Sequence, residues 1–441
     1  MSKSMLKSFP GGLHPNDSKL ATAALPIEDC PLPPELIIPF AQHIGAPAES
    51  CVHVGQTVLK GEVIGTAKGF VSVPVHASTS GEVIAIEPRP HASGRLLPAV
   101  VIRPNGRETW SPDLDGVIPQ SLTPAELRER IWQAGLVGLG GATFPVHVKL
   151  SPPDDTPIDT LIINGVECEP YLTADHRLML EAPQRILAGI RILRRILRPK
   201  RVFVGIEANK PDAIALLQPV LFKHGIEVVP LAVKYPQGAE KQLILACTGR
   251  EVPSGGLPMA AGCVVQNVAT TAAVADAILD GRPLIERICT VAGPGIANPK
   301  NLRIRVGTPL QHLVEVCGGL TCEPERILMG GPMMGAAQLS LAVPATRGTS
   351  GLLIFGPGQL PVRTEGPCIR CAHCVGACPS RLLPTTIAAH SRLDRYDDAE
   401  QYGAMDCIEC GCCSYACPAG IPLVQALRQA KGAILEKRRR G

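Results

Sequence analysis

The chain of 441 residues is poor in aromatic side chains, in net charge and in long apolar runs. Phe, Trp and Tyr make up only 3% of it, which argues against a nucleic-acid surface built on base stacking. A formal net charge of +4 indicates no strongly polyanionic partner. No window approaches the ~20 apolar residues of a membrane-spanning helix, and the first residues lack the apolar core of a signal peptide. We therefore expect a globular chain of several domains with no transmembrane segment of its own.

Cysteine, in contrast, is abundant, with 17 in the chain. Eight of them form two copies of the pattern C-x2-C-x2-C-x3-C-P, which are Cys368, Cys371, Cys374 and Cys378, then Cys407, Cys410, Cys413 and Cys417. This pattern holds [4Fe–4S] clusters in bacterial ferredoxins, where three closely spaced thiolates bind one cluster and the fourth cysteine binds the other. The crossing predicts a first cluster on Cys368, Cys371, Cys374 and Cys417, and a second on Cys378, Cys407, Cys410 and Cys413.

The alternative use of such cysteines is structural zinc, but zinc sites pair two C-x2-C units across a longer gap. Two electron-carrying clusters are therefore the better interpretation. Cys412 is a spare cysteine within the second motif. Because cluster ligands are reduced thiolates, we expect a reducing, cytosolic compartment rather than a secreted disulfide framework.

The N-terminal part of the chain divides into two regions. Residues 1–35 form an irregular, Pro-rich extension whose most distinctive string is Gly11-Gly12-Leu13-His14-Pro15. Residues 36–110 consist of short β-branched runs with regular glycines, which predicts a small all-β unit. That unit resembles a biotinyl/lipoyl-type barrel-sandwich domain. Lys68 stands near the modified lysine of such domains but lacks its flanking sequence, so we expect an ordinary surface side chain.

Residues 120–280 alternate between strand-like and helical patterns. A helix begins after Thr123, where Thr123-Pro124-Ala125-Glu126 forms a capping box, and strand-like runs lie at 160–164, 201–206 and 227–233. This order predicts an α/β domain with a largely parallel sheet. The Arg-rich helix at 185–201 carries one apolar stripe, which either packs on the sheet or lies on a membrane surface.

Three shorter regions follow. Residues 285–340 carry short strands and glycine-rich turns, and residues 345–366 are a Gly/Pro-rich linker that lets the next unit move. Residues 367–437 hold both cysteine motifs and a last helix. We expect the basic end, residues 437–440, to be a solvated tail.

A glycine-rich loop at residues 135–145 is the second informative feature. Closely spaced glycines let backbone N–H groups approach a phosphate without a Cβ in the way. The loop follows a helix, whereas a dinucleotide-binding Rossmann turn follows a strand. On this loop alone, a tight structural turn and a phosphate site are equally good interpretations.

Four segments in register resemble the NADH-binding flavoprotein subunit of respiratory complex I. They are the loop with Gly138, Gly140, Phe144, Pro145 and Lys149, then residues 164–170, 235–240 and 266–270. The resemblance implies a site for FMN and NAD(H). Val166 and Ala239 depart from the pattern because each stands where an acid is usual, so FMN affinity or nucleotide geometry is expected to differ.

The resemblance also implies a role for each matching residue. In the glycine loop, the backbone at Gly138 and Gly140, with Gly141 beside them, would cradle a phosphate and Lys149 would add a cation. Phe144 would stack on the adenine, and Asn164 and Asn267 would hydrogen-bond the flavin. Tyr235 and Gly238 would line the flavin edge. Glu167 and Glu169 would contact the nicotinamide side, and Glu240 would contact the ribose. No side chain is required as a catalytic base, because hydride transfer belongs to the cofactors.

Across essentially its whole length the chain resembles the RnfC family, the C subunits of the Rnf (Rsx) ion-translocating electron-transport complex. The resemblance is carried by residues 11–15, 75–78, 138–150, 163–175, 330–335 and 367–371 with their repeat. It implies a barrel-sandwich unit, a complex I flavoprotein-like α/β domain, a small β-grasp-like (SLBB) domain and an α-helical, ferredoxin-like domain with two clusters.

The same resemblance implies an electron-transfer subunit of a translocase, carrying FMN and two [4Fe–4S] clusters and reacting with NAD(H). The protein would be peripheral, on the cytoplasmic face of the bacterial inner membrane. Its partners would be the other subunits of the complex and a ferredoxin-like electron carrier, with no role for nucleic acid.

Two alternatives remain open. Soluble flavin and iron–sulfur reductases, such as the cobalamin reductases of bacterial microcompartments, share these modules, but there the barrel-sandwich unit follows the flavin domain. A docking protein with a decayed flavin site would keep only the cluster relay. Val166 and Ala239 give this second alternative slight support. Against it count four retained residues, which are Gly138, Lys149, Asn164 and Glu167.

Overall fold

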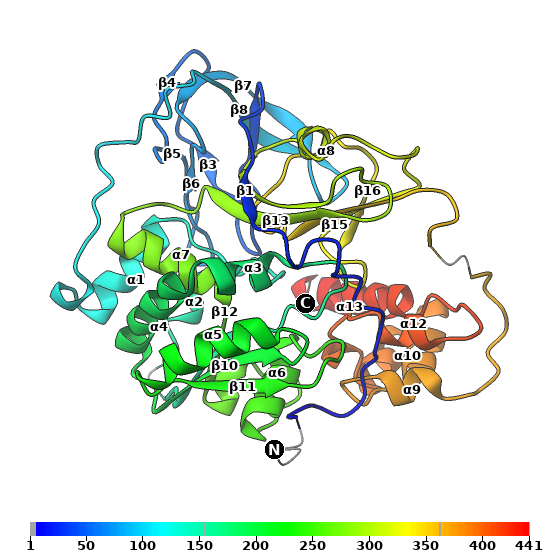
Figure 1. Ribbon diagram of the computed structural model, residues 1–441. Coiled ribbons are helices and arrows are strands. Elements are labelled where there is room, and N and C mark those ends of the chain that lie inside the picture. Colours follow the sequence, from blue (N-terminus) through cyan, green and yellow to red (C-terminus); the bar gives the residue numbers. More distant parts are fainter. Residues whose placement is uncertain (1–5, 154, 361–362, 441) are drawn as a thin grey trace.

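The computed structural model describes residues 6–153, 155–360 and 363–440. Its β-rich part lies above an α/β layer, and a helical unit that ends the chain lies beside the α/β layer and below the β-rich part (Figure 1). The N-terminal segment runs along the surface between the α/β layer and the helical unit before it enters the β-rich part. Segments far apart in the sequence therefore meet where these three parts join.

The all-β prediction for residues 36–110 is confirmed. One antiparallel sheet has the order β2 (Leu36–Pro39), β8 (Leu96–Pro104), β7 (Gly81–Pro90) and β4 (Thr57–Val58), and a second has β3 (Glu49–Ser50), β5 (Val63–Thr66) and β6 (Val75–His76). Leu36, Ile38 and Ile64 lie in the core between them. Lys68 is exposed and pairs with Glu49, as expected of a surface lysine.

The parallel sheet is also confirmed. Its order is β11 (Glu227–Leu231), β10 (Arg201–Glu207), β9 (Thr160–Asn164) and β12 (Cys263–Asn267), and every neighbouring pair is parallel. Apolar residues of α1 (Pro124–Gln133), α4 (Pro183–Leu197), α5 (Pro211–Phe222) and α7 (Val268–Leu279) share one core with the sheet. Residues of α6 (Glu240–Thr248) share a second core with it. Thr123 and Glu126 form the predicted capping box of α1.

Helix α4 resolves the choice left open for its apolar stripe. Ile186, Leu187, Ile190 and Leu193 are buried in the core. The helix packs mainly on α7 and α1, with contacts to β9. The stripe therefore stabilises the α/β layer and is not available to a membrane surface.

A six-stranded sheet corrects three of the expected boundaries. Its order is β1 (Ile27–Asp29), β14 (Lys300–Arg305), β13 (Glu286–Ala292), β17 (Gly351–Phe355), β15 (Arg326–Met329) and β16 (Ala336–Gln338), with α8 (Leu310–Val316) packed on it. The prediction of a linker at residues 345–366 was wrong for β17, whose residues are all buried between β13 and β15. The boundary at 285–340 is also too narrow for this sheet. The extension at residues 1–35 contributes β1 and is not irregular throughout.

The helical unit contains α9 (His373–Ala377), α10 (Pro384–Arg392), α11 (Tyr396–Gln401), α12 (Cys412–Ala416) and α13 (Leu423–Arg440). The basic end is exposed, as predicted, but it is helical rather than a disordered tail, because α13 continues to Arg440. Lys437 pairs with Asp397 and Arg438 with Glu400, which neutralises the charges along the helix. Among the described residues no helix is long and apolar enough to cross a bilayer.

Short helices complete the fold. They are α2 (Val146–Lys149), α3 (Ala174–Glu181) and the 3₁₀ turns at Pro119–Ser121, Pro258–Ala261 and Ala404–Asp406. Helix α2 follows the glycine loop and α3 follows the segment with Glu167 and Glu169, so both lie next to the predicted cofactor residues.

Candidate functional site: a flavin-like centre beside two cysteine motifs

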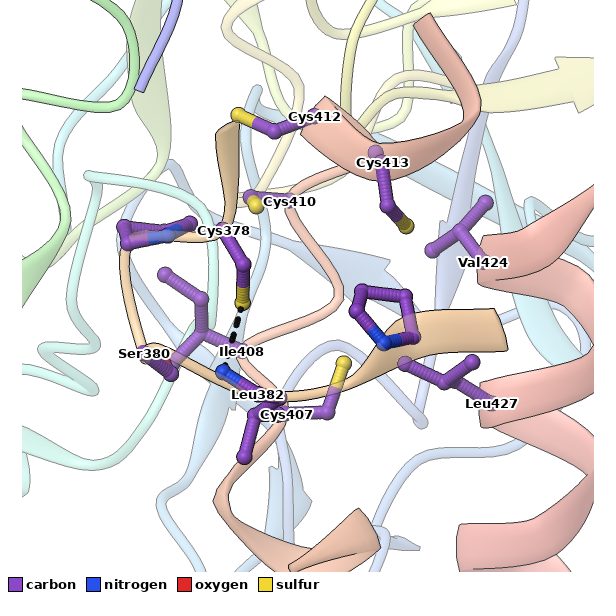
Figure 2. Close-up of a pocket in the computed structure, with 13 residues that line it drawn as sticks. Cys378, Ser380, Leu382, Cys407, Ile408, Cys410, Cys412, Cys413, Val424 and Leu427 are labelled. Atoms are coloured by element: carbon purple, nitrogen blue, oxygen red, sulfur yellow. Dashed lines mark hydrogen bonds between the residues drawn. The ribbon is translucent and has the colours of Figure 1, made fainter. Parts of the chain in front are cut away.

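The second cysteine motif surrounds a pocket. Its lining includes Cys407, Cys410 and Cys413 together with Cys378 from the first motif. Figure 2 shows these four sulfur atoms around one common space, whereas the sulfur of Cys412 points away from it. This grouping agrees with the crossed assignment of the second cluster, which remains a prediction.

The first motif places its cysteines partly at the surface. Cys368 and Cys371 are exposed, whereas Cys374 and Cys417 are buried in the apolar core of the helical unit. Burial raises the pKa of the Cys374 thiol, and the nearby thiols of Cys417 and Cys368 raise it further. Three of the four cysteines predicted for the first cluster, Cys368, Cys374 and Cys417, are thus neighbours.

The donor set fits two clusters. Burial raises the pKa of the Cys413 thiol to about 12, and Cys407, Cys410 and Cys378 add to this effect. Bound iron would offset both causes, because it stabilises the thiolate directly. No three His, Cys, Asp or Glu side chains among the described residues gather closely enough for a single metal ion. The four thiolates of a four-iron cube stand further apart, because each binds a different iron.

The glycine loop closes on itself and rests on α7. The N–H of Gly138 donates to the Phe144 carbonyl at 2.9 Å, and the N–H of Leu139 donates to Oγ1 of Thr270 at 2.8 Å. A Cβ on Gly140 would lie 3.2 Å from Cβ of Asn267, whereas one on Gly141 would meet open space. The loop therefore leaves a cradle beside Asn267 and an open rim at Gly141.

The two predicted asparagines stand side by side at the carboxyl ends of parallel strands, where α/β sheets bind ligands. Asn164 ends β9 and is the register partner of Asn267, which ends β12. Asn164 Nδ2 donates to the Gly238 carbonyl at 2.8 Å. Asn267 caps α7 with its Oδ1 and donates from Nδ2 to Asp175 at 2.6 Å. These contacts join the glycine loop to the other predicted segments.

Lys149 and Glu240, which were predicted near the phosphate and the ribose, form an ion pair. Lys149, on α2, donates from Nζ to Oε1 of Glu240 at 2.6 Å and to the Val265 carbonyl at 3.3 Å. Lys149 and Glu240 are both about one third exposed, so this pair lies at the edge of the site. Phe144, which lies in the glycine loop between Gly138 and Lys149 in the sequence, is half-buried.

Glu167 and Glu169 have specific partners within the protein. Glu167 accepts hydrogen bonds from the N–H groups of Asp175 and His176 at the start of α3. Glu169 accepts from the N–H groups of Met333 and Met334, both at 2.9 Å. Burial raises the pKa of Glu169 to about 7 despite these two donors. Both carboxylates thus hold neighbouring loops in place, in addition to any contact with a nucleotide.

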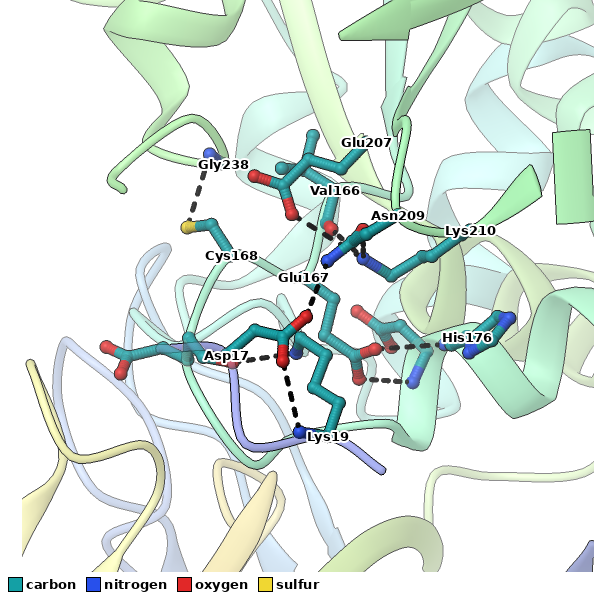
Figure 3. A network of polar contacts seen from close by, with 12 residues as sticks. Asp17, Lys19, Val166, Glu167, Cys168, His176, Glu207, Asn209, Lys210 and Gly238 are labelled. Carbon is teal, nitrogen blue, oxygen red and sulfur yellow. Dashed lines mark hydrogen bonds and ion pairs between the residues drawn. The ribbon is translucent and has the colours of Figure 1, made fainter. Parts of the chain in front are cut away.

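A buried charge network lies beneath these residues, and the sequence analysis did not identify it (Figure 3). Lys210 and Glu207 form a pair with exposed side-chain fractions of 1% and 2%, and Lys210 Nζ donates to the Val166 carbonyl at 2.7 Å. Lys19 of the N-terminal segment donates to the carbonyls of Glu169 and Leu172. A buried charge looks like a surface charge in the sequence. The available signal is that Glu207 is the last residue of a strand and Lys210 follows three residues later.

Asp175 and Arg287 were missed for the same reason. Burial raises the pKa of Asp175 to about 7, and the neighbouring Glu167 contributes in the same direction. Arg287 is buried and donates to the Leu139 carbonyl at 2.7 Å, directly beneath the glycine loop. The loop therefore has a fixed positive charge under its backbone.

Tyr235 joins this centre to the second cysteine motif. Its hydroxyl donates to the Cys410 carbonyl at 2.8 Å, and the side chain is 1% exposed. Leu13 forms a β-bridge with Tyr235, and the N–H of Gly12 donates to the Ala377 carbonyl at 2.9 Å. The string at residues 11–15 thus packs where the two parts meet.

The glycine loop, Asn164, Asn267 and the segments around Glu167 and Tyr235 together form what we call the flavin-like centre. The described residues there fit a bound polar molecule. Both amide atoms of Gln237 and Nε2 of Gln266 are buried without a hydrogen-bond partner among the described residues. Such groups are costly unless water or a ligand satisfies them. The open glycine loop lies at the same strand ends.

Four family models match successive parts of the chain. They are the RnfC barrel sandwich hybrid domain at residues 7–107, the Nuo51 FMN-binding domain at 131–276, the SLBB domain at 288–337 and the 4Fe-4S dicluster domain at 360–418. The expected architecture is therefore confirmed.

Three relatives match nearly the whole chain. The C subunit of the proton-translocating ferredoxin:NAD(+) oxidoreductase complex of Clostridium ljungdahlii is 47% identical over 91% of this chain and 88% of its own length. The C subunit of the Na(+)-translocating ferredoxin:NAD(+) oxidoreductase complex of Acetobacterium woodii is 46% identical over 98% of each chain. The C subunit of the ion-translocating oxidoreductase complex of Rhodobacter capsulatus is 45% identical over 98% of this chain and 84% of its own.

Among solved structures, the NAD+-reducing [NiFe]-hydrogenase in the H2-reduced state has a TM-score of 0.48 at 20% identity. The match covers 71% of this chain and 63% of the hydrogenase chain. At that level the likeness carries no argument about function.

Proposed function

Because the chain belongs to the RnfC family, the C subunits of ion-translocating ferredoxin:NAD(+) oxidoreductase (Rnf) complexes, we propose that it carries electrons between NAD(H) and the rest of such a complex. The complex would couple this transfer between NAD(H) and ferredoxin to ion movement. The observation that carries the proposal is the 2.8 Å hydrogen bond between Tyr235 and Cys410. It joins the flavin-like centre to a cysteine motif within one folded body.

FMN, when bound, supplies hydride exchange with NAD(H) and release of single electrons, and two [4Fe–4S] clusters supply one-electron carriers. Gly138, Gly140 and Gly141 would leave room for a phosphate, and Arg287 beneath the loop and Lys149 at the edge would favour its charge. Two sets of cysteines, Cys368, Cys371, Cys374 and Cys417, then Cys378, Cys407, Cys410 and Cys413, would hold the clusters.

The other predicted residues would shape the pocket. Asn164 and Asn267 present amide groups at the carboxyl ends of β9 and β12. Tyr235 and Gly238 would line the flavin edge, with Phe144 and Glu240 towards the nucleotide. Glu167 and Glu169 would act chiefly by holding α3 and the 330–335 turn around the nicotinamide side.

We further propose that the protein is peripheral and lies on the cytoplasmic face of the membrane. Reduced cysteine ligands, the family and its membrane-complex relatives support that position. The partners would be the other subunits of the complex and a ferredoxin-like carrier.

The test is an anaerobic NADH titration of cluster-reconstituted protein supplied with FMN, followed by visible absorption and EPR. We expect NADH to bleach the flavin and to generate reduced-cluster signals. If dithionite reduced the clusters but NADH did not bleach the flavin, the result would contradict the proposal. The protein would then be a docking subunit that only relays electrons.

A pair of glycine variants sharpens this test. Gly140→Ala places a Cβ 3.2 Å from Asn267, within the proposed cradle, whereas Gly432→Ala in α13 meets open space. We expect the first to weaken FMN binding in a fluorescence titration and the second to leave it unchanged. Equal FMN affinities in the two variants would contradict the placement of the phosphate.

A further inference from the structure

The two cysteine motifs face different surroundings. In the first motif, Cys368 and Cys371 are exposed, and Ile369 between them is 66% exposed. In the second motif, Cys410, Cys412 and Cys413 are buried. The clusters that these motifs would hold are therefore not equivalent in their access to the outside.

The second motif contacts the flavin-like centre through several groups. Tyr235 donates a hydrogen bond from its hydroxyl to the Cys410 carbonyl, and Tyr235, Cys410 and Cys412 share one apolar cluster with Met333. Met333 belongs to the turn that Glu169 holds. A Cβ on Gly411 would lie 3.3 Å from the Met333 carbonyl. The wall of the second cluster and the wall of the flavin-like centre thus share residues.

Cys378, the predicted fourth ligand of the second cluster, is enclosed from the same side. A Cβ on Gly11 would lie 2.7 Å from the Cys378 carbonyl, and Gln242 of α6 donates to the Pro379 carbonyl at 3.4 Å. In contrast, the hydrogen bonds of residues 363–374, as far as the structure describes them, lie within the helical unit. The first motif therefore faces outward.

We propose that the second cluster exchanges electrons with the flavin site, that Tyr235 positions it there, and that the first cluster exchanges electrons with an external one-electron iron–sulfur carrier protein at residues 367–373. The inference rests on the proposed function and adds the order of the carriers. Electron tunnelling weakens steeply with distance, so direct packing against the flavin-like centre decides which cluster is reduced first. Arg363 and Arg370 are exposed at the first motif, and their positive charges favour a carrier with an acidic face.

The electron count closes on this order. Oxidation of one NADH to NAD+ delivers a hydride, which is two electrons and one proton. The two electrons pass singly through the second and then the first cluster to two molecules of the oxidised carrier protein, and the proton is released to solvent. Carrier-driven reduction of NAD+ is the same sequence reversed.

Single-ligand variants test the order. Cys413→Ser removes a ligand of the second cluster and Cys371→Ser removes one of the first. In Cys413→Ser we expect NADH to bleach the flavin while the remaining first cluster stays oxidised, although dithionite reduces it. In Cys371→Ser we expect NADH to reduce the remaining second cluster as in the unaltered protein, with loss of electron transfer to added ferredoxin.

Iron content and the dithionite-reduced EPR spectrum establish that each variant retains one cluster. The opposite pattern, with NADH reducing the first cluster in Cys413→Ser and failing to reduce the second in Cys371→Ser, would overturn the order. Bleaching the flavin by light with EDTA as donor gives the same test without NADH. A failure of the proposed function, in which NADH does not react, is thus distinguished from a failure of the inferred order.

A milder pair of variants tests the role of Tyr235 without removing a cluster. Tyr235→Phe deletes the donor to Cys410, and Tyr415→Phe changes a tyrosine of the same motif whose side chain is 47% exposed. The Tyr235 hydroxyl donates to the Cys410 carbonyl rather than to a sulfur, so it acts through space. By offsetting the negative end of that carbonyl it favours the reduced, more negative form of the cluster. We expect Tyr235→Phe to lower the reduction potential of the second cluster and to slow its reduction by NADH, with the first cluster unchanged in a redox titration followed by EPR. Potentials identical to those of Tyr415→Phe would refute the positioning role.

Discussion

The two cysteine motifs have almost the same backbone and opposite surroundings. Helices α9 and α12 each have five residues, and each follows a left-handed residue, Ala372 or Gly411, and ends at an extended cysteine, Cys378 or Cys417. Yet the first motif exposes two of its cysteines, whereas the second packs against Tyr235. The repeated spacing determines the local fold, and the neighbours of each copy determine what that copy can exchange electrons with.

The largest expected effect comes from the Lys210–Glu207 charge pair, which lies beneath the flavin-like centre and is linked to the second motif through Lys234 and Tyr235. Lys210→Met leaves Glu207 buried without its cation, and loss of one partner of a buried pair costs about 3–5 kcal/mol. Glu207 also accepts the N–H of Lys234, next to Tyr235. We expect chemical denaturation to show this loss, with the second cluster released before the first.

Lys437→Met is the matched control for Lys210→Met. Lys437 pairs with Asp397 on the surface of the outer unit, where both side chains are about 70% exposed. Surface pairs contribute little, so we expect an unchanged unfolding midpoint. If both lysine variants lost the same free energy of unfolding, the buried charge network would not be what supports the second cysteine motif.

We also expect stability to depend on pH through Glu169, on the side of the second motif that faces the flavin-like centre. Burial raises the pKa of Glu169 from 4.5 to about 7, which corresponds to about 3 kcal/mol. For an acid with a raised pKa, stability is full below pH 4.5 and falls as the pH rises towards 7. Glu169→Gln should match the unaltered protein at pH 4.5 and exceed its free energy of unfolding at pH 8.

Glu436→Gln, on the exposed face of α13, serves as the control for Glu169→Gln. We expect it to keep the pH dependence of the unaltered protein between pH 4.5 and 8. Asp175, whose pKa is also raised to about 7, keeps part of the pH dependence in this variant. A stability curve for Glu169→Gln that falls as steeply as that of the unaltered protein would contradict the raised pKa of Glu169.

The contact between the N-terminal segment and Cys378 predicts a smaller effect. Gly11→Ala and Gly55→Ala both place Ala at a positive φ, 79° and 86°, so their backbone costs are comparable. Only Gly11 would bring a Cβ against backbone, 2.7 Å from the Cys378 carbonyl. Overpacking adds about 1–3 kcal/mol. We expect faster loss of the second cluster to a chelator in Gly11→Ala alone, measured by EPR, and equal rates would contradict this contact.

The smallest effect concerns a left-handed position that is alanine in the first motif and glycine in the second. Ala372 has φ +60° where the second motif has Gly411 with φ +78°. A left-handed conformation costs a non-glycine residue about 1 kcal/mol, so Ala372→Gly should raise the free energy of unfolding by about that amount. Ala433→Gly, within α13, should instead lower the free energy of unfolding by about 1 kcal/mol. A destabilised Ala372→Gly variant would contradict the left-handed geometry.

Local patterns predicted much of the fold. The capping box at Thr123, the strands near residues 160, 201 and 227 and the all-β unit follow from short-range chemistry. The linker prediction failed at β17 because glycines and prolines on both sides hid a short apolar strand. Such a strand is recognisable only when two neighbouring strands lie beside it.

The candidate site was predictable to a similar degree. Motif order identified Asn164, Asn267 and Lys149, which the structure brings to neighbouring strand ends and loops. Lys19, Asp175 and Arg287 were missed, because burial and partners give these charges their role, and neither is visible locally. The direct ligand roles of the predicted residues remain predictions.

The sequence by itself determined the chemistry of this protein. The cysteine spacing predicts cluster ligands because thiolates must reach iron from one turn, and the glycine loop predicts where backbone can approach a phosphate. Only the tertiary structure decided the geometry between these groups. It brings Gly11, Tyr235 and Met333 against the second motif and leaves the first at the surface, because packing between distant segments selects one of two nearly identical motifs for burial.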